Sequence, residues 1–390
     1  MKYDAEILIA GAGPAGCATA IRLVDAGCDV LVIERDTLTP GPDLTSGEVL
    51  SPMAQRELRD VGLRIAGDWV FDQVDKVRNV YPDLSWTLHS VPSGLEYRHI
   101  DRGGLNAALR QRLLQAGGRI ECEQTVTEVD MRDDGVVLRT RHGREFRANM
   151  LIDAAGRHGP ALTALKLKQP EPEFRQIGIA IFYESFEGTP LDTWDRHLYG
   201  DHGAMISGSR IRNGLYRYIL EADLDDKQQR GMRPVEFYEY IAETYDPWIR
   251  ERCMREPRVG DVWTMAPLAH RAADVTRDRL LLVGDAAGYL SPFTGQGVEI
   301  ALRGARLAAQ AVAAAARLDD YSAGRFAPYV EGRNAEVATL VSHLRRMLRF
   351  VRDRDALLRA STDDALRAQH LLPLPVIDRG TLRGSTTAQA

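Results

Sequence analysis

A glycine-rich turn between two apolar segments is the clearest chemical feature of the sequence. Ile7–Ala10 leads into Gly11-Ala12-Gly13-Pro14-Ala15-Gly16, an Ala/Leu-rich helix and a second apolar run, Val30–Ile33. Continuous apolar runs are typical of parallel strands that are buried on both faces. In such a turn Gly11 makes the bend, Gly13 lets a pyrophosphate approach the backbone, and Gly16 permits close helix–strand packing. The amino end of the helix then faces the phosphates.

An acidic residue closes the second apolar run. Glu34 follows Ile33 directly, at a position where a carboxylate accepts hydrogen bonds from ribose hydroxyls. A glycine-rich turn without a ligand is the alternative interpretation, but the order strand, turn, helix, strand and acid favours an adenine dinucleotide. This stretch alone does not decide between FAD and NAD(P).

A second glycine-rich site follows another buried apolar run, Arg279–Val283. Gly284-Asp285 comes first, and Pro292 to Gly297 then precedes a long Ala-rich helix. An Asp at the end of a buried strand can accept a hydrogen bond from a ribityl hydroxyl. Amides at a helix start can stabilise negative charge on a reduced flavin. The alternative is a turn whose glycines only cap the helix, and pairing with the first turn favours the flavin interpretation.

Composition is that of an ordinary enzyme, with 44% hydrophobic and 27% charged residues and a formal net charge of −5. We find no zinc spacing or basic tract and therefore expect no metal site and no nucleic-acid partner. Four dispersed cysteines suggest free thiols in a reducing compartment. No apolar run is long enough to span a bilayer, and Asp4 and Glu6 interrupt a signal-like start, so we expect a cytoplasmic protein.

The element pattern predicts an α/β fold in which a Rossmann-like FAD-binding domain carries an inserted antiparallel-sheet substrate domain and a helical C-terminus. Aromatic residues in the inserted sheet mark it as the substrate-binding half: Phe182, Tyr183, Trp194, Tyr199, Tyr216 and Tyr218. We assign the segments as follows: 1–75, 99–161 and 269–330 to FAD binding, 76–98 and 162–268 to the substrate domain, and 331–390 to a C-terminal helical region with a loose tail from Leu371.

Several motifs occur together in an order typical of a known superfamily. Besides the first turn, these are Arg102 before a leucine-rich helix, Asp153-Ala154-Ala155-Gly156-Arg157, and Gly284-Asp285-Ala286-Ala287-Gly288. The chain resembles the superfamily of FAD-dependent aromatic hydroxylases, geranylgeranyl reductases and flavin-dependent halogenases over roughly residues 4–330. The resemblance is specific for fold and FAD and much less specific for the reaction.

The resemblance implies a set of FAD-binding residues. Arg35 and Arg102 would lie along the dinucleotide, Val126 beside adenine, and the Gly295–Val298 amides at the isoalloxazine edge. The complete set expected to bind FAD is Gly11, Gly13, Pro14, Ala15, Gly16, Glu34, Arg35, Arg102, Val126, Asp153, Gly156, Gly284, Asp285, Gly295, Gln296, Gly297 and Val298. Glu48 and Pro292 are the candidates for pocket residues near the flavin, and no catalytic acid or base is identified.

Three functions remain open from the resemblance. We favour a monooxygenase that hydroxylates an aromatic or other electron-rich substrate through a flavin C4a-hydroperoxide. The alternatives are a reductase of prenyl double bonds and a maturation flavoprotein acting on a protein- or carrier-bound substrate. The stretch from Asp153 lacks the Asp-Gly motif of simple hydroxylases, so the electron donor is either NAD(P)H or a partner reductase. Halogenation is disfavoured, because no WxWxIP motif occurs and Lys76 lies in an expected strand.

A basic amphipathic helix and two histidine positions each allow both a functional and a purely structural interpretation. The helix expected over 340–358 carries an apolar stripe opposite five arginines. Such a helix can bind a membrane surface or a partner, or it can pack its apolar stripe against the protein core. We favour core packing. His197 and His270-Arg271 could reach the pocket, but ordinary polar roles are favoured for each.

Overall fold

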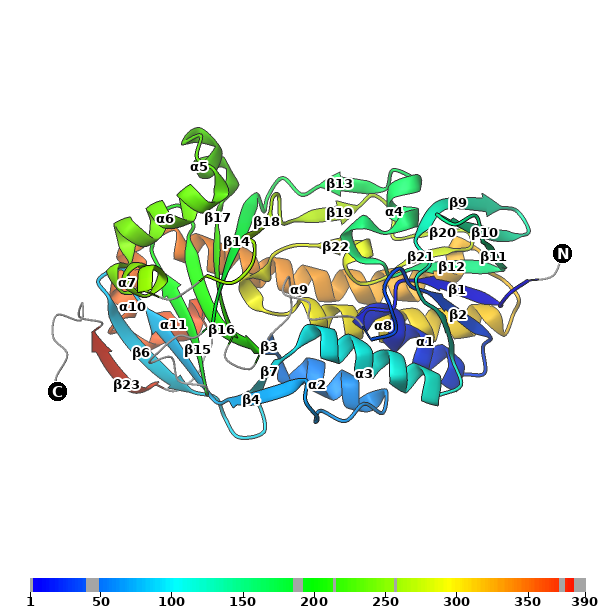
Figure 1. Cartoon of the computed structure of the whole chain (residues 1–390), viewed down its shortest axis with the longest axis horizontal. Coiled ribbons are helices and arrows are strands. Elements are labelled where there is room, and N and C mark those ends of the chain that lie inside the picture. The colour runs from blue at the N-terminus through cyan, green and yellow to red at the C-terminus, as the bar shows by residue number, and fades with distance from the viewer. Residues whose placement is uncertain are drawn as a thin grey trace.

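The computed structural model describes residues 3–39, 49–184, 192–212, 215–255, 258–371 and 376–381. A mostly parallel sheet forms one end of the elongated molecule and a larger, mainly antiparallel sheet forms the other, with α8 and α9 running between them (Figure 1). The candidate site Glu48 lies outside the described residues.

The first sheet has the order β20-β21-β12-β1-β2-β8 and is parallel except at β20. Its four central strands are fully buried, as their continuous apolar sequences predict. The register pairs Ala10 with both Ile33 and Asp153, so the carboxyl ends of three strands meet at one edge. The strand bounds are β1 Ile7–Ala10, β2 Val30–Ile33, β8 Arg119–Glu121, β12 Met150–Asp153, β20 Thr276–Arg277 and β21 Leu280–Leu282.

Two layers cover this sheet. Helices α1 (Pro14–Asp25), α3 (Arg102–Gln115) and α8 (Gly297–Ala316) share a core with one face. A three-stranded antiparallel sheet and α4 (Pro160–Ala164) pack on the other face. That small sheet consists of β9 Val126–Arg132, β10 Gly135–Thr140 and β11 Glu145–Ala148.

The second large sheet has the order β18-β14-β17-β16-β15-β5-β6-β23. It joins strands from 76–98 and 162–268 with one strand from the C-terminal region. Trp263–Met265 forms its edge strand β18 against β14. The bounds are β5 Lys76–Val80, β6 Ser85–Ser90, β14 Gln176–Tyr183, β15 Thr193–Leu198, β16 Met205–Arg212, β17 Leu215–Asp223, β18 Trp263–Met265 and β23 Val376–Thr381.

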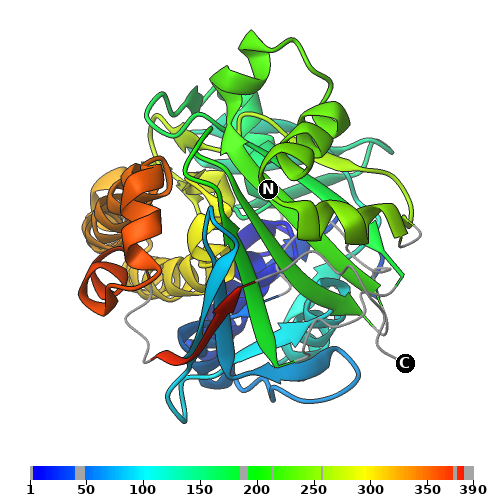
Figure 2. The same cartoon turned by 90° about the vertical axis from the view of Figure 1, so that its left-hand side faces the viewer.

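Helices lie on both sides of this sheet (Figure 2). One face packs against α6 and α7, and part of the other packs against α9 to α11. The helix bounds are α5 Leu224–Gln229, α6 Pro234–Tyr245, α7 Pro247–Arg255, α9 Ala327–Val351, α10 Arg354–Ala360 and α11 Asp364–His370.

Short elements join the two halves. Helix α2 (Pro52–Asp60) begins after Ser51, whose hydroxyl accepts the amide of Ala54 at 3.1 Å and so caps the helix. Two further sheets, ordered β3-β7-β4 and β13-β19-β22, complete the connections. Their strands are β3 Val49–Leu50, β4 Val70–Val74, β7 Tyr97–Ile100, β13 Lys168–Pro170, β19 His270–Ala272 and β22 Gly288–Tyr289.

The apolar stripe of the 340–358 segment packs into the core. Leu344, Met347, Leu348 and Val351 are buried beside residues of α10 and of the second large sheet. On the outer face Arg345 pairs with Glu173. The core-packing interpretation is therefore confirmed, although the helix ends at Val351 and α10 continues the segment.

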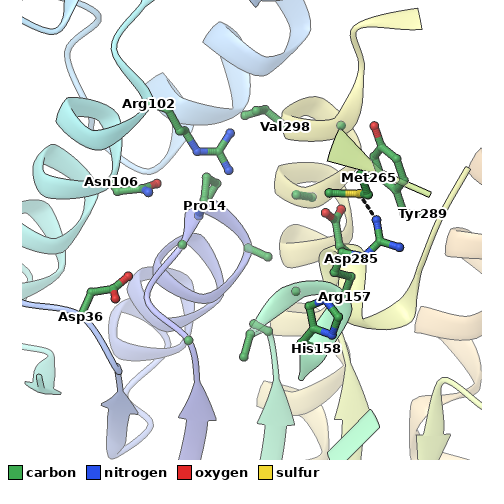
Figure 3. A pocket seen from close by; sticks show the side chains of 18 of the residues that line it. Pro14, Asp36, Arg102, Asn106, Arg157, His158, Met265, Asp285, Tyr289 and Val298 are labelled. Carbon is green, nitrogen blue, oxygen red and sulfur yellow. Dashed lines mark hydrogen bonds between the residues drawn. The ribbon is translucent and has the colours of Figure 1, made fainter. Parts of the chain in front are cut away.

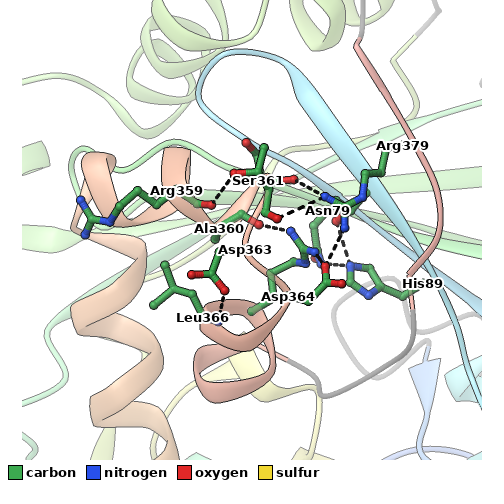
Figure 4. Close-up of polar contacts among 12 residues, drawn as sticks. Asn79, His89, Arg359, Ala360, Ser361, Asp363, Asp364, Leu366 and Arg379 are labelled. Carbon is green, nitrogen blue, oxygen red and sulfur yellow. Dashed lines mark hydrogen bonds and ion pairs between the residues drawn. The ribbon is translucent and has the colours of Figure 1, made fainter.

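The prediction of a loose tail from Leu371 is wrong for residues 376–381. This segment forms β23, which pairs antiparallel with β6. Arg379 donates hydrogen bonds to the carbonyl groups of Ser361 and Thr362 and pairs with Asp364 at 2.6 Å (Figure 4). The partner strand lies almost 300 residues away in sequence, so local polarity carried no signal of the pairing.

Candidate cofactor and substrate site

A cavity of about 540 Å³ extends from the carboxyl edge of the parallel sheet to the second large sheet. Its walls come from residues far apart in the chain, from Ala10 to Ala301. Of the predicted cofactor and pocket residues, these line it: Gly11, Gly13, Pro14, Ala15, Glu34, Arg35, Arg102, Val126, Gly156, Asp285, Pro292, Gly295, Gly297 and Val298. Gly16, Asp153, Gly284 and Gln296 do not.

The glycines of the first turn have three different surroundings. Gly11 has φ +95°, and a Cβ there would stand 2.7 Å from the Cα of Ala155. A Cβ on Gly16 would stand 1.9 Å from the Gly11 carbonyl oxygen, so this glycine serves packing. A Cβ on Gly13, by contrast, would meet nothing within 4 Å. Gly13 therefore leaves open space at the start of α1, as an approaching pyrophosphate requires.

Glu34 is held in place at the end of β2. Its carboxylate accepts the amide of Ala12 at 2.5 Å and that of Asp36 at 2.9 Å. Arg110 lies 3.4 Å from the same carboxylate and donates to the carbonyl groups of Ala12 and Thr37. The sequence analysis did not identify Arg110. Its position as a single charge on the buried, leucine-rich face of α3 is the feature that could have marked it as a functional residue. Arg35 is largely exposed beside Asp36.

Opposite charges face one another across the middle of the cavity. Arg102, at the start of α3, has a buried Nε without a hydrogen-bond partner among the described residues. Its side chain points toward Pro14 at the start of α1 (Figure 3). Burial raises the pKa of Asp285, while the charges of Arg102 and Arg157 oppose that rise. An unpartnered guanidinium opposite a helix amino end fits a diphosphate, so these residues suit an extended dinucleotide.

Asp153 serves a structural purpose rather than the expected contact with cofactor. It is fully buried, and its carboxylate accepts the amides of Ala155, Ala161 and Leu162 at 2.8–3.1 Å. Burial raises its pKa to about 6, although these three amides lower it. The carboxylate therefore organises the start of α4, and its neighbour Ala154 lines the cavity instead.

The second glycine-rich segment ends at the opposite end of the cavity. Gly295 has φ +64°, and a Cβ there would lie 3.4 Å from the Trp194 ring. Helix α8 then begins at Gly297, after Gln296 as its N-cap. The free amides of this helix start could stabilise negative charge on a flavin ring, as expected from the sequence.

One face of the second large sheet forms the remaining wall. Alternate residues of β17 (Arg217, Ile219 and Glu221) line the cavity, since successive strand residues point to opposite faces. Of the six aromatic residues marked by the sequence, only Trp194 lies on this wall. Tyr183, Tyr199, Tyr216 and Tyr218 belong to the core under α6 and α7, and Phe182 to a smaller core cluster.

Glu221 is an unusual wall residue that sequence reasoning missed. It is 2% exposed, and its Oε2 atom has no hydrogen-bond partner in the part of the chain that the structure describes. Burial raises its pKa to about 8, although the charge of Arg217 opposes this. Burial also raises the pKa of nearby Tyr289 well above its usual value, with a further contribution from the charge of Asp285. At neutral pH both groups are therefore mainly protonated and able to donate.

The two histidines have the ordinary roles that were favoured. His197 is bonded to Asp246 at 2.6 Å on the sheet face opposite the cavity. His270 donates from Nε2 to the Asp285 carbonyl at 2.9 Å, and burial lowers its pKa to about 4. Lys76 pairs with Asp192 and Asp75 and does not line the cavity.

Comparisons with known proteins identify the family. A family model described as an FAD binding domain matches residues 4–342. The chain therefore belongs to this family of FAD-binding proteins, within the FAD-dependent hydroxylase-like superfamily that its motifs indicated. It is an FAD-dependent oxidoreductase.

Curated relatives catalyse different reactions. A brominase of pyrrole-carbonyl peptidyl carrier protein from Pseudoalteromonas luteoviolacea is 28% identical over 80% of this chain and 77% of its own. A digeranylgeranylglycerophospholipid reductase from Methanothermobacter thermautotrophicus is 24% identical over 88% and 85%. A menaquinone reductase from Mycobacterium tuberculosis is 27% identical over 79% and 76%.

Solved structures confirm the fold. The flavin-dependent brominase Bmp2 superposes with a TM-score of 0.79 at 21% identity, covering 94% of this chain and 92% of that one. Among the described residues, no helix is long and apolar enough to cross a membrane.

Proposed function

We propose that this oxidoreductase reduces a carbon–carbon double bond of a largely apolar substrate, with Glu221 as the proton donor. The supporting observation is the neutral carboxyl of Glu221 on the cavity wall, whose Oε2 has no hydrogen-bond partner among the described residues. Saturating a double bond adds a hydride to one carbon and a proton to the other. A buried acid that retains its proton at pH 7 is suited to the second role.

The chain's own residues divide the remaining tasks. The first turn, Arg102 and the α8 amides would hold FAD, which in its reduced form would supply two electrons as a hydride. Glu221 holds the transferable proton, and Tyr289 is a second protonated group beside it. Ile219, Trp263 and Leu268 supply apolar and aromatic surface that excludes water and orients the substrate.

Hydroxylation of an electron-rich aromatic substrate is the second candidate function. The aromatic wall residues Trp194, Trp263 and Tyr289 favour a flat substrate, and Arg217 could stabilise a phenolate. A carboxyl that remains protonated at neutral pH is a poor base for forming that phenolate, so reduction is preferred. Halogenation is less well supported, because no lysine among the described residues lines the cavity.

The electrons come from NAD(P)H or from a partner reductase. The substrate is a small molecule, either free or held on a carrier. Relatives named for a carrier-bound pyrrole and for prenyl lipids make both forms reasonable for this protein. We also propose that the division into cofactor and substrate segments follows the boundaries given above.

The test uses the FAD-loaded protein, reduced with dithionite under anaerobic conditions in deuterated water. It is mixed with geranylgeraniol, menadione or cinnamate, and the visible flavin band and product mass are followed. We expect the flavin band to return with one of the alkenes, together with a saturated product that carries two solvent deuteriums, one from the exchangeable N5 position of the reduced flavin and one from the proton donor. A band that stays bleached with every alkene, combined with hydroxylation of a phenol in air, would refute reduction and support the second candidate.

A further inference from the structure

Tyr289 is a hydroxyl donor that a ligand in the cavity can reach. It lies on β22, lines the cavity and is partly exposed. Its hydroxyl forms no hydrogen bond with another described residue. Because burial raises the pKa of this hydroxyl well above its usual value, the group keeps its proton at neutral pH. Tyr289 therefore offers the cavity a neutral donor that is available to a substrate.

The ring of Tyr289 stands against the start of α8. A Cβ on Gly297 would lie 3.7 Å from the Tyr289 ring, so the ring is within ordinary contact distance of this helix start. Pairing of Tyr289 with His270 of β19 holds the ring in this place. The amino end of α8 is the part of the site assigned above to the flavin ring. Tyr289 therefore borders the region in which a substrate would meet that ring.

Tyr289 and Glu221 belong to the same part of the cavity. Glu221 is among the ionisable groups near enough to affect the pKa of Tyr289. The sheet register aligns Glu221 and Met265 on either side of Gly178. Arg157 contacts the Met265 sulfur and is another of the groups that act on Tyr289 (Figure 3). The fold thus brings two neutral proton donors together, one on the sheet and one beside α8.

Two neutral donors suit a conjugated double bond better than an isolated one. A hydride added to an isolated double bond leaves an electron pair on carbon, as a strongly basic carbanion. In an α,β-unsaturated carbonyl compound the same pair moves to the carbonyl oxygen, and a hydroxyl donor there stabilises the developing charge. Protonation before hydride addition is no alternative, because an acid with a pKa of about 8 is too weak to protonate an isolated alkene.

We propose that the substrate is an α,β-unsaturated ketone or aldehyde whose carbonyl oxygen accepts a hydrogen bond from Tyr289. A hydride from the reduced cofactor adds to the β-carbon, and the π electrons move onto the oxygen. Glu221 then gives its proton to the α-carbon, the carbonyl group re-forms, and Glu221 takes a proton from solvent. Two electrons and one hydrogen thus come from the cofactor, and the second hydrogen comes from Glu221. This inference rests on the proposed reduction and names the substrate class for it.

The first test measures binding to the oxidised, FAD-loaded protein without an electron donor, through the shift of the visible flavin spectrum. The probes are benzalacetone and its isostere in which a methylene group replaces the carbonyl oxygen. One neutral hydrogen bond predicts ~2- to ~10-fold tighter binding of benzalacetone. Tyr289→Phe should bind the two probes equally. Equal binding by the native protein, no binding of benzalacetone, or a preference that survives in Tyr289→Phe would overturn the assignment.

The second test follows anaerobic reoxidation of the protein after reduction with one equivalent of dithionite. Benzalacetone should restore the flavin band and yield the saturated ketone, whereas the methylene isostere should leave the band bleached. Tyr289→Phe should keep its FAD and its thermal stability but react ~10²- to ~10³-fold more slowly, the usual loss when an oxyanion donor is removed. The matched control is Tyr3→Phe, which removes an exposed hydroxyl bonded to the Asp134 carbonyl and should change neither binding nor rate.

The two proposals can fail separately. Binding of benzalacetone that depends on Tyr289, without return of the flavin band with any alkene, would refute the proposed reduction alone. Reduction of the methylene isostere or of geranylgeraniol as fast as benzalacetone would refute the carbonyl contact of Tyr289 alone.

Discussion

Replacing Glu221 by glutamine removes one proton from the cavity wall while preserving its shape. In the native protein the pKa of this carboxyl is raised from 4.5 to about 8 by burial. The reduction rate of the reduced holoenzyme should therefore be constant below pH 7 and fall ~10-fold for each pH unit well above 8. Glu221→Gln should lower the rate ~10²- to ~10⁴-fold and lose this pH dependence.

The same substitution has an opposite effect on stability. At ~1.4 kcal/mol for each pKa unit, the change from 4.5 to about 8 corresponds to ~5 kcal/mol against ionisation in the folded state. Because the folded pKa is raised, the contribution of Glu221 to stability is complete below pH 4.5 and is lost as the pH rises through 8. Glu221→Gln avoids that loss and should be more stable than the native protein by up to ~3 kcal/mol at pH 7.

Both effects can be measured on one preparation. Stopped-flow traces of flavin reoxidation from pH 6 to 10 give the rate, and urea unfolding from pH 5 to 9 gives the stability. Glu173→Gln, at an exposed ion pair with Arg345, is the control and should alter neither pH profile. A Glu221→Gln variant that keeps the native pH–rate profile, or whose stability runs parallel to that of the native protein from pH 5 to 8, would refute the reasoning.

Three further predictions concern the cofactor site. Gly13→Ala should fold normally, since its Cβ meets nothing, but should lose FAD in gel filtration; retention of yellow colour would contradict this. Arg102→Met should weaken FAD binding ~10- to ~100-fold in fluorescence titrations, because a charged contact to the diphosphate is lost, and unchanged affinity would count against that contact. Asp153→Asn should lower the free energy of unfolding by ~1–3 kcal/mol with bound FAD unaltered; a selective loss of FAD would restore the original expectation.

Local sequence patterns determined the frame of this protein. The apolar runs at Ile7–Ala10 and Val30–Ile33 form buried parallel strands, and Ser51 caps α2, because strand burial and helix capping depend on neighbouring residues. The turn from Gly11 has the predicted conformation for the same reason: φ +95° is costly for any residue with a Cβ. The same patterns also indicated the family to which the chain belongs and its cofactor, FAD.

Only the tertiary structure decided the chemistry of the cavity. In the sequence, Glu221 is indistinguishable from an ordinary polar strand residue. In the fold, β14 and β16 lie on either side of it and its carboxyl is buried, so the carboxyl stays protonated at neutral pH. Arg110 reaches Glu34 from α3, and the Asp153 carboxylate accepts an amide at the start of α4. Burial and partnership arise from long-range pairing, which local sequence patterns do not encode.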